Sequence, residues 1–162
     1  KSLGFKKIYG VDNSPQKFFL IKKLGIKNVY NLKNKNSKNK FLRDISGGVD
    51  YCIEAAGLTK TIELGFSLLN NTGKLIFASH PKKNDKISLD PHQLIKGKNI
   101  KGSWGGNFNP DKDIKKLLKI FKKGKIDLKI LTRNVYKLKH INKAIKDLKS
   151  GKVFRPIIEM SH

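Results

Sequence analysis

Cysteine is nearly absent from this sequence, and so are long apolar runs. Cys52 is the only cysteine among 162 residues, which excludes an internal disulfide and a thiolate zinc site built from this chain alone. No apolar run approaches the roughly 20 residues that a membrane-spanning helix needs. The chain starts at Lys1 with neither a charged-then-apolar signal segment nor a cleavage motif. We therefore expect a cytoplasmic protein that has no membrane contact.

Acidic residues are also scarce, since 12 Asp and Glu face 36 Lys and Arg and leave a formal charge of +24. Such a charge favours nucleic acid as a partner, because clustered cations gain from counterion release. However, only Arg43, Arg133 and Arg155 carry the guanidinium fork that reads bases and phosphates. The lysines are scattered over every segment. We expect no specific nucleic acid as a partner, and keep a basic nucleic-acid-binding module as an alternative.

Short apolar runs alternate with amphipathic stretches along the whole chain. Runs that are apolar on both faces and separated by helices are typical of a parallel sheet covered on both sides. Capping residues, such as Ser14 before Pro15 and Thr59 at a later helix, mark where the predicted helices begin. We expect strands at 7–11, 27–30, 48–54, 74–79, 100–104, 130–136 and 153–159, and helices at 15–25, 41–45, 59–69, 91–97, 110–123 and 140–149.

Three details of this pattern can be checked against a structure. Residues 31–40 are nearly all Lys and Asn, which predicts a solvated loop, and residues 71–73 (Asn-Thr-Gly) predict a turn. The helix at 110–123 is strongly amphipathic. We expect its apolar side chains to face inward, namely Ile114, Leu117, Leu118 and Phe121.

Asp12 is the sharpest chemical feature, because it ends the first strand directly before a capped helix. In a doubly wound nucleotide-binding sheet, an acid at this place accepts hydrogen bonds from the adenosine ribose and repels a 2′-phosphate. Lys17, about one turn into the helix, can reach the same ribose. The alternative is that Asp12 only caps the turn. Glu54 and Gly57, after a later strand, are ordinary loop residues when taken alone.

Five motifs occur together in a characteristic order: residues 4–12, residues 47–57, residues 73–76, residues 101–106 (Lys-Gly-Ser-Trp-Gly-Gly) and residues 150–158. In this order and spacing the whole chain resembles the zinc-containing alcohol dehydrogenases, the medium-chain dehydrogenase/reductase family. The resemblance implies an α/β fold, a Rossmann-like doubly wound parallel sheet. Residues 1–106 would form the NAD-binding domain, and residues 107–162 a C-terminal segment that returns to the catalytic domain.

The resemblance also implies roles for particular residues. Asp12 and Lys17 match the positions that hold the adenosine ribose, with a preference for NAD. Arg155 matches an arginine that reaches the cofactor pyrophosphate, the alternative being a surface arginine on an edge strand. Residues 78–80 with Ser103 and Trp104 match the loops around the nicotinamide, so Ala78 belongs to this set. For Trp104 a core or interface aromatic is the alternative.

Two parts of the family pattern are missing from this sequence. The Gly-rich loop that receives the pyrophosphate is absent, and with it the first strand of the sheet, which is central in the order 3-2-1-4-5-6. The catalytic zinc ligands, two cysteines and a histidine, are absent as well. The four histidines show no ligand spacing, and Cys52 is typical of a small buried apolar residue. We expect the chain to be the C-terminal part of a longer dehydrogenase, inactive alone.

The expected function is the cofactor-binding part of an NAD-dependent and zinc-dependent alcohol dehydrogenase. The complete enzyme would act on a small alcohol or aldehyde, with zinc bound by residues outside this chain, and would form a homodimer or homotetramer. Two alternatives stay open: a zinc-free quinone or enoyl reductase-like member of the same superfamily, and the basic nucleic-acid-binding module.

Overall fold

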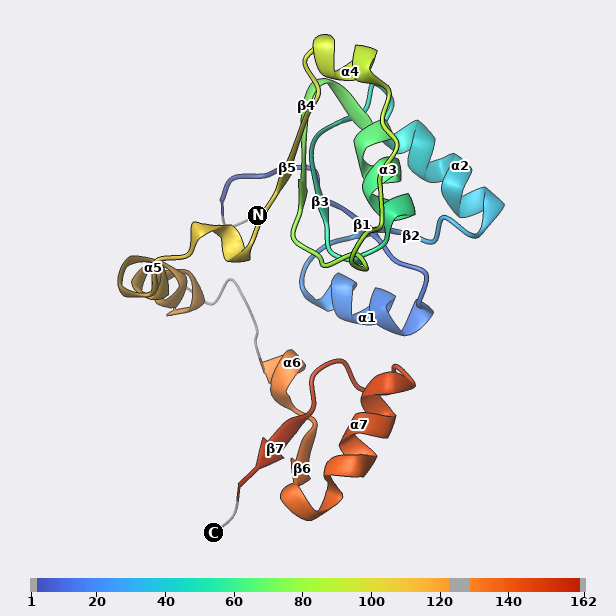
Figure 1. Ribbon diagram of the computed structural model, residues 1–162. Helices are drawn as coiled ribbons and strands as arrows, with labels where there is room; N and C mark the ends of the chain where they lie inside the picture. The colour runs from blue at the N-terminus through green and yellow to red at the C-terminus, as the bar shows by residue number, and fades with distance from the viewer. Residues whose placement is uncertain (1–2, 123–128, 161–162) are drawn as a thin grey trace. The chain divides into compact units, whose positions relative to one another are not determined.

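A computed structural model describes residues 3–122 and 129–160 and shows an α/β fold whose strands pair in parallel (Figure 1). The strands form three small sheets, ordered β1-β2, β3-β4-β5 and β6-β7. The chain divides into two compact units, residues 39–113 and residues 1–38 together with 114–162. The expected α/β class with parallel strands is confirmed.

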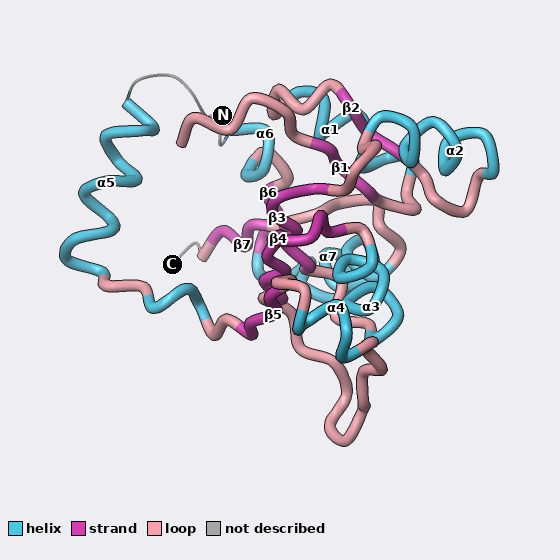
Figure 2. The backbone as a smooth tube through the Cα atoms, turned by 90° about the horizontal axis from the view of Figure 1, so that it is seen from above, coloured by secondary structure: helices cyan, strands magenta, loops and turns pink. Residues whose placement is uncertain are grey.

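The unit of residues 39–113 is built on the sheet of β3 (Val49–Glu54), β4 (Leu69–Phe77) and β5 (Asn99–Gly102). Helix α3 (Thr59–Ser67) lies along one face of this sheet in both views (Figures 1 and 2). Between them lies a core of four buried apolar side chains: Ile62, Phe66, Leu69 and Leu75. Gly65 allows the close approach, because a Cβ there would lie 2.9 Å from Cys52 Sγ.

The opposite face of β3 is open among the described residues. Side chains alternate along a strand, so Tyr51 and Ile53 point away from α3, and they are 52% and 74% exposed. Cys52, on the core side, packs against the buried cluster, as expected for a small apolar residue. The pKa of the Cys52 thiol is raised, mainly by burial and to a smaller extent by the negative charge of Glu54. The expected covering of both sheet faces is therefore present on one face only in this unit.

Two short elements complete the unit. Asp90 caps α4 (Pro91–Ile95) through a hydrogen bond from the His92 backbone N–H at 2.9 Å. Lys98 donates to the carbonyl of Phe66 and to Gln93 Oε1, which ties the chain after α4 to α3. The 3-10 helix η1 (Gly105–Asn107) follows β5.

In the other unit, β1 (Tyr9–Val11) pairs with β2 (Asn28–Tyr30), and α1 (Pro15–Lys23) connects them. A Cβ at Gly10 would lie 3.0 Å from the Ile21 side chain, so glycine allows α1 to pack on the strand. Helix α2 (Lys35–Asp44) follows β2, and its residues from 39 onward belong to the unit of residues 39–113.

The remaining elements lie between residues 110 and 160. Helix α5 is Pro110–Lys122, followed within the described ranges by α6 (Lys129–Thr132). Strand β6 (Val135–Lys137), η2 (Leu138–His140), α7 (Ile141–Lys149) and β7 (Ile157–Glu159) then form a βαβ arrangement. The Tyr136 hydroxyl donates to Asp147 Oδ2 at 2.9 Å and joins β6 to α7.

Several expectations about these elements are wrong. The Lys and Asn run forms most of α2 because Asn34 Oδ1 accepts from the Ser37 N–H at 2.9 Å, a cap that the composition conceals. Residues 71–73 belong to β4. The pairing of β4 with β3 shifts register there, from Val49 opposite Leu69 to Tyr51 opposite Lys74. The N-cap of α3 is Leu58, not Thr59. Residues 129–132 are helical, so β6 is shorter than predicted, and β7 starts only at Ile157.

The apolar face of α5 also differs from the expectation. Its side chains are not buried among the described residues, since their exposed fractions lie between 43% and 53%: Ile114, Leu117, Leu118 and Phe121. The amphipathic pattern predicted the helix correctly, but periodicity alone does not say what covers an apolar face. The last residue of the predicted range, at 123, lies outside the described residues.

Candidate functional site

The Asp12 carboxylate follows the last residue of β1. Its Oδ1 accepts from the Ser14 backbone N–H at 2.8 Å, and its Oδ2 lies 3.1 Å from Nζ of Lys17. The two side chains of this ion pair are 26% and 46% exposed. The structure therefore brings together two of the predicted site residues, and it shows that Asp12 is also a cap.

This arrangement fits a ribose diol. Ligands of parallel α/β sheets bind at the carboxyl ends of the strands, which is where Asp12 lies. An ionised carboxylate offers about four lone-pair positions, and the contacts with Ser14 and Lys17 use only part of them. Two vicinal hydroxyls can donate to the remainder, whereas a phosphate would meet a like charge. The ribose role of the pair stays a prediction that this geometry supports.

A second carboxylate, Glu54, lies at the carboxyl end of β3 and is only 5% exposed. Its Oε1 accepts from the backbone N–H groups of Ala56 at 2.7 Å and Gly57 at 3.0 Å, and from Thr61 Oγ1 at 2.7 Å. Its Oε2 accepts from the Ser79 hydroxyl. Glu54 therefore ties together the loop after β3, the first turn of α3 and the loop after β4.

The network around Glu54 determines its charge. Burial raises the pKa of this carboxyl, but the hydrogen bonds from Ser79, Thr61, Ala56 and Gly57 outweigh burial and leave the pKa below its ordinary value of 4.5. Each of these donors stabilises the ionised form. Glu54 is consequently a buried, fully ionised acceptor at neutral pH.

Gly57 lets the two loops meet. Its φ is +76°, in the left-handed region that favours glycine. A Cβ at this position would lie 3.3 Å from the His80 carbonyl oxygen. The turn after β3 therefore packs directly on the loop after β4, which brings Glu54 within reach of Ser79.

A cavity of about 380 Å³ opens at the carboxyl ends of β4 and β5, and seven residues line it: Phe77, Ser79, His80, Pro81, Gly102, Ser103 and Trp104. The His80 and Trp104 rings meet edge to face with centroids 4.5 Å apart. Trp104 is 86% exposed, so it is not a core residue in the described part of the chain. Phe77 and Trp104 supply apolar walls, and the two serines supply polar groups.

The residues predicted to surround the nicotinamide lie at this cavity. Ser103 and Trp104 line it directly. Ala78 is the neighbour of Ser79, and its N–H donates to the Glu54 carbonyl at 2.9 Å, which fixes the start of the loop. Their role in cofactor binding stays a prediction.

Arg155 lies in the bend before β7 and is exposed. The sequence predicted a strand at 153–159 that includes Arg155, but β7 begins only at Ile157. No carboxylate in the described ranges forms an ion pair with it. A guanidinium without an ion-pair partner can bind a pyrophosphate bidentately, and this role of Arg155 stays a prediction.

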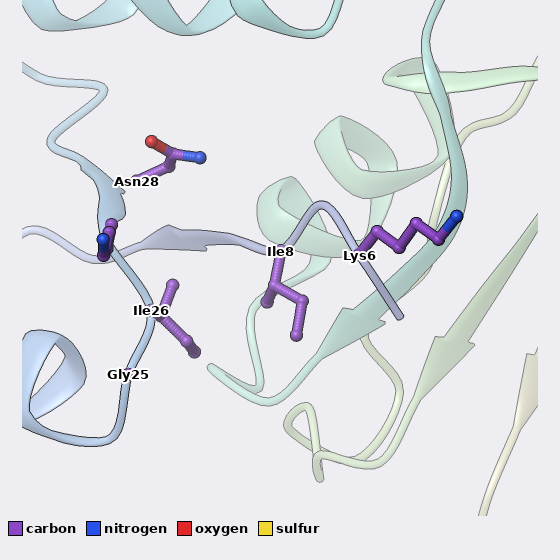
Figure 3. A pocket seen from close by; sticks show the side chains of 6 residues that line it. Lys6, Ile8, Gly25, Ile26 and Asn28 are labelled. Atoms are coloured by element: carbon purple, nitrogen blue, oxygen red, sulfur yellow. The ribbon is translucent and has the colours of Figure 1, made fainter. Parts of the chain in front are cut away.

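A smaller hollow of about 120 Å³ lies before β1 and β2 and is lined by Lys6, Ile8, Gly25, Ile26, Lys27 and Asn28 (Figure 3). It lies at the amino ends of these two strands. Because α/β sheets bind ligands at the opposite edge, this hollow is no candidate for a cofactor site.

A zinc site is not available in the described part of the chain, where no group of three or more His, Cys, Asp or Glu side chains could hold a metal ion. The residues present therefore do not fit the catalytic zinc that the resemblance implies. Within residues 3–122 and 129–160 there is also no helix long and apolar enough to cross a membrane.

Sequence reasoning missed the Glu54 network. It treated Glu54 and Gly57 as ordinary loop residues, and it named Ser79 only within a range. One signal was available: an acid that ends a buried strand and is followed three residues later by glycine must find donors locally. The partner at Ser79, 25 residues away, depends on the strand register and could not be read from local sequence.

Parallel strands joined by helices, with polar side chains at their carboxyl ends, are typical of the nucleotide-binding α/β part of a dehydrogenase. The sequence profile described as zinc-binding dehydrogenase matches residues 1–123. The chain belongs to this family, whose members are NAD(P)-dependent oxidoreductases, and it corresponds to the nucleotide-binding part of a medium-chain dehydrogenase.

Individual relatives agree with this assignment. The chain is 33% identical over 162 residues to alcohol dehydrogenase-like 5 of Arabidopsis thaliana, covering 98% of this chain and 42% of that protein. The crystal structure of benzyl alcohol dehydrogenase from Acinetobacter calcoaceticus matches with a TM-score of 0.89 at 28% identity, over 98% of this chain and 44% of that one. An alcohol dehydrogenase zinc-binding domain protein from Burkholderia ambifaria gives a TM-score of 0.88 at 28% identity, over 97% and 42% of the two chains. The chain thus spans less than half the length of these relatives.

Proposed function

We propose that this chain is the cofactor-binding part of an NAD-dependent alcohol dehydrogenase, with residues 1–106 as the NAD-binding domain and residues 107–162 as a segment of the catalytic domain. The observation that carries the proposal is the Asp12–Lys17 pair at the carboxyl end of β1. It offers lone pairs for the adenosine ribose and a negative charge against a 2′-phosphate. The relatives named as alcohol dehydrogenases support the choice of an alcohol as substrate.

When bound, NAD supplies the acceptor for a hydride from the alcohol carbon. The chain's own residues bind and orient it. Asp12 and Lys17 hold the adenosine ribose, and Arg155 neutralises the pyrophosphate. Ser79, Ser103 and Trp104 form the walls around the nicotinamide, with Ala78 fixing the loop that carries Ser79. The zinc ligands and most of the substrate pocket belong to a part of the protein outside this chain, which in its complete form is a homodimer or homotetramer.

The proposal is tested by calorimetric titration of the complete protein that carries this sequence with NAD and NADP. We expect saturable binding of NAD that is tighter than binding of NADP. Arg155→Gln should weaken NAD and ADP-ribose, which carry the pyrophosphate, and leave adenosine binding unchanged. A protein that binds neither dinucleotide would contradict the proposed function.

A further inference from the structure

His80 places a titratable ring at the larger cavity. It follows Ser79 in the loop after β4 and lines the cavity together with Trp104 from the loop after β5. Histidine is the side chain whose charge ordinarily changes between pH 5 and 8. The proposed function assigns His80 no role, although it lies between residues that are expected to surround the nicotinamide.

Two contacts fix how His80 lies. Its carbonyl oxygen packs on the turn after β3, 3.3 Å from the position that a Cβ at Gly57 would take. Its ring packs on Trp104, edge to face, with centroids 4.5 Å apart. Because both residues line the same cavity, the imidazole and the indole stand together at its wall. Neither ring nitrogen of His80 has a hydrogen-bond partner within residues 3–122 and 129–160, so both are available to solvent or to a ligand.

The segments packed around His80 carry other charged groups, which lie on its own loop, on the turn after β3 with the start of α3, and on β5. They are Glu54, Lys60, Lys82, Lys83, Asp85 and Lys101. Glu54 is nearly inaccessible and already accepts four hydrogen bonds, whereas the other five are exposed. None of these residue types ordinarily changes charge between about pH 6 and pH 8. A change of charge at this cavity in that range therefore points to His80.

The two redox states of the cofactor differ in the charge of the ring that the cavity is proposed to take. The oxidised nicotinamide ring is a cation, and the reduced ring is neutral. A cation is attracted to the face of an indole ring, so the oxidised ring gains from Trp104 while His80 is neutral. A protonated His80 repels the oxidised ring and competes with it for the same indole. The reduced ring meets neither penalty.

We propose that His80 is a specificity-determining residue whose protonated form makes the cavity favour the reduced over the oxidised cofactor. This inference rests on the proposed function, in which the cavity takes the nicotinamide end of NAD. Linkage between two bound species is reciprocal. Replacing bound NAD by NADH in mildly acidic solution should therefore take up protons.

The experiment is calorimetric titration of the complete protein with NAD, NADH and ADP-ribose, which lacks the pyridine ring, at about pH 6 and about pH 8. We expect the ratio of NADH affinity to NAD affinity to be at least about threefold higher at the lower pH, since two unit charges about 4 Å apart give a factor of about five even in bulk water. ADP-ribose, normalised to the same conditions, reports pH effects that arise elsewhere in the protein. Its affinity should not follow the change in the ratio.

Two variants of His80 separate its charge from its shape. His80→Gln stays neutral and polar, so the affinity ratio should become the same at both pH values. His80→Lys carries a positive charge at both, so it should favour NADH at both. Binding of ADP-ribose by each variant shows that the fold is retained.

His92→Gln is the matched control, because His92 lies in α4 and is not among the residues lining the cavity. This variant should keep the pH dependence of the wild type. A ratio that is independent of pH in the wild type, or a dependence that persists in His80→Gln or disappears in His92→Gln, would overturn the inference and leave the proposed function in place. Failure of the wild type to bind NAD, NADH and ADP-ribose would instead refute the proposed function.

Discussion

Asp12→Asn separates the two roles that the structure gives to Asp12. The asparagine oxygen can still accept from the Ser14 N–H, so the cap before α1 is kept. The negative charge is lost, and Lys17 loses its partner. The variant should therefore change the choice of cofactor without changing the fold.

The size of the effect follows from the exposure of the site. A hydrogen bond to a charged group contributes about 1 kcal/mol more than one to a neutral group, so NAD should lose about that much. Removing a like charge beside the 2′-phosphate in a solvated site, at about 4 Å, gains NADP about 1 kcal/mol. Together these changes move the ratio of the kcat/KM values for the two cofactors about thirtyfold toward NADP. The exposed ion pair contributes little to stability, so the melting temperature should hardly change.

Steady-state kinetics of the complete enzyme with both cofactors measures this ratio. Asp90→Asn is the matched control, because Asp90 Oδ1 also accepts from an N–H two residues later, that of His92. The control should leave the ratio unchanged. If Asp12→Asn also left it unchanged, Asp12 would be a cap and nothing more, and the reasoning about the ribose would be refuted.

Three further predictions concern stability and charge. Gly57→Ala should lower the free energy of unfolding by at least about 1–2 kcal/mol, the cost of a left-handed φ for a residue with a Cβ. Gly47→Ala is the control, because Gly47 has a similar φ but open space around its Cβ, and it should cost less. Denaturant unfolding compares the two variants. The hydrogen bonds to Glu54 lower its pKa below the ordinary value of 4.5. The ionised carboxylate therefore stabilises the fold above pH 4.5, and this contribution is lost as the pH falls through the folded-state pKa. The difference in unfolding free energy between wild type and Glu54→Gln should be constant at neutral pH and shrink in acid. Equal stabilities at neutral pH would contradict this account of the network. The +24 charge should give weak, sequence-independent binding to duplex DNA that is lost between low and physiological salt, and selective sub-micromolar binding at physiological salt in an electrophoretic assay would favour a nucleic-acid function instead.

Some local signals predicted the helix starts correctly, whereas the cap at Thr59 and the turn at residues 71–73 were wrong. Helices α1 and α4 begin at Pro15 and Pro91, where the predicted ranges 15–25 and 91–97 begin. Asn34 provides an equally local cap, but it stands in a run of Lys and Asn whose composition resembles a loop. The helix α6 could not be distinguished from a strand by its apolar residues, because short apolar runs suit both.

The candidate site shows the same division between local and distant contacts. The pairing of Asp12 with Lys17 joins residues five apart and follows from a strand followed by a helix. The bond from Ser79 to Glu54 depends on the parallel register of β3 and β4, in which Glu54 lies opposite Phe77. Sequence patterns predicted both strands but not the register that places these two side chains together.

The central claim is that this chain binds the cofactor of an alcohol dehydrogenase. The most direct test is to give the complete protein NAD and a panel of primary and secondary alcohols, and to follow the absorbance of the reduced nicotinamide. We predict that NAD is reduced with at least one alcohol, faster than NADP, and that Asp12→Asn reverses or removes this preference. A preparation that binds dinucleotides but reduces neither cofactor with any alcohol would contradict the assignment of substrate, and one that binds no dinucleotide at all would contradict the claim itself.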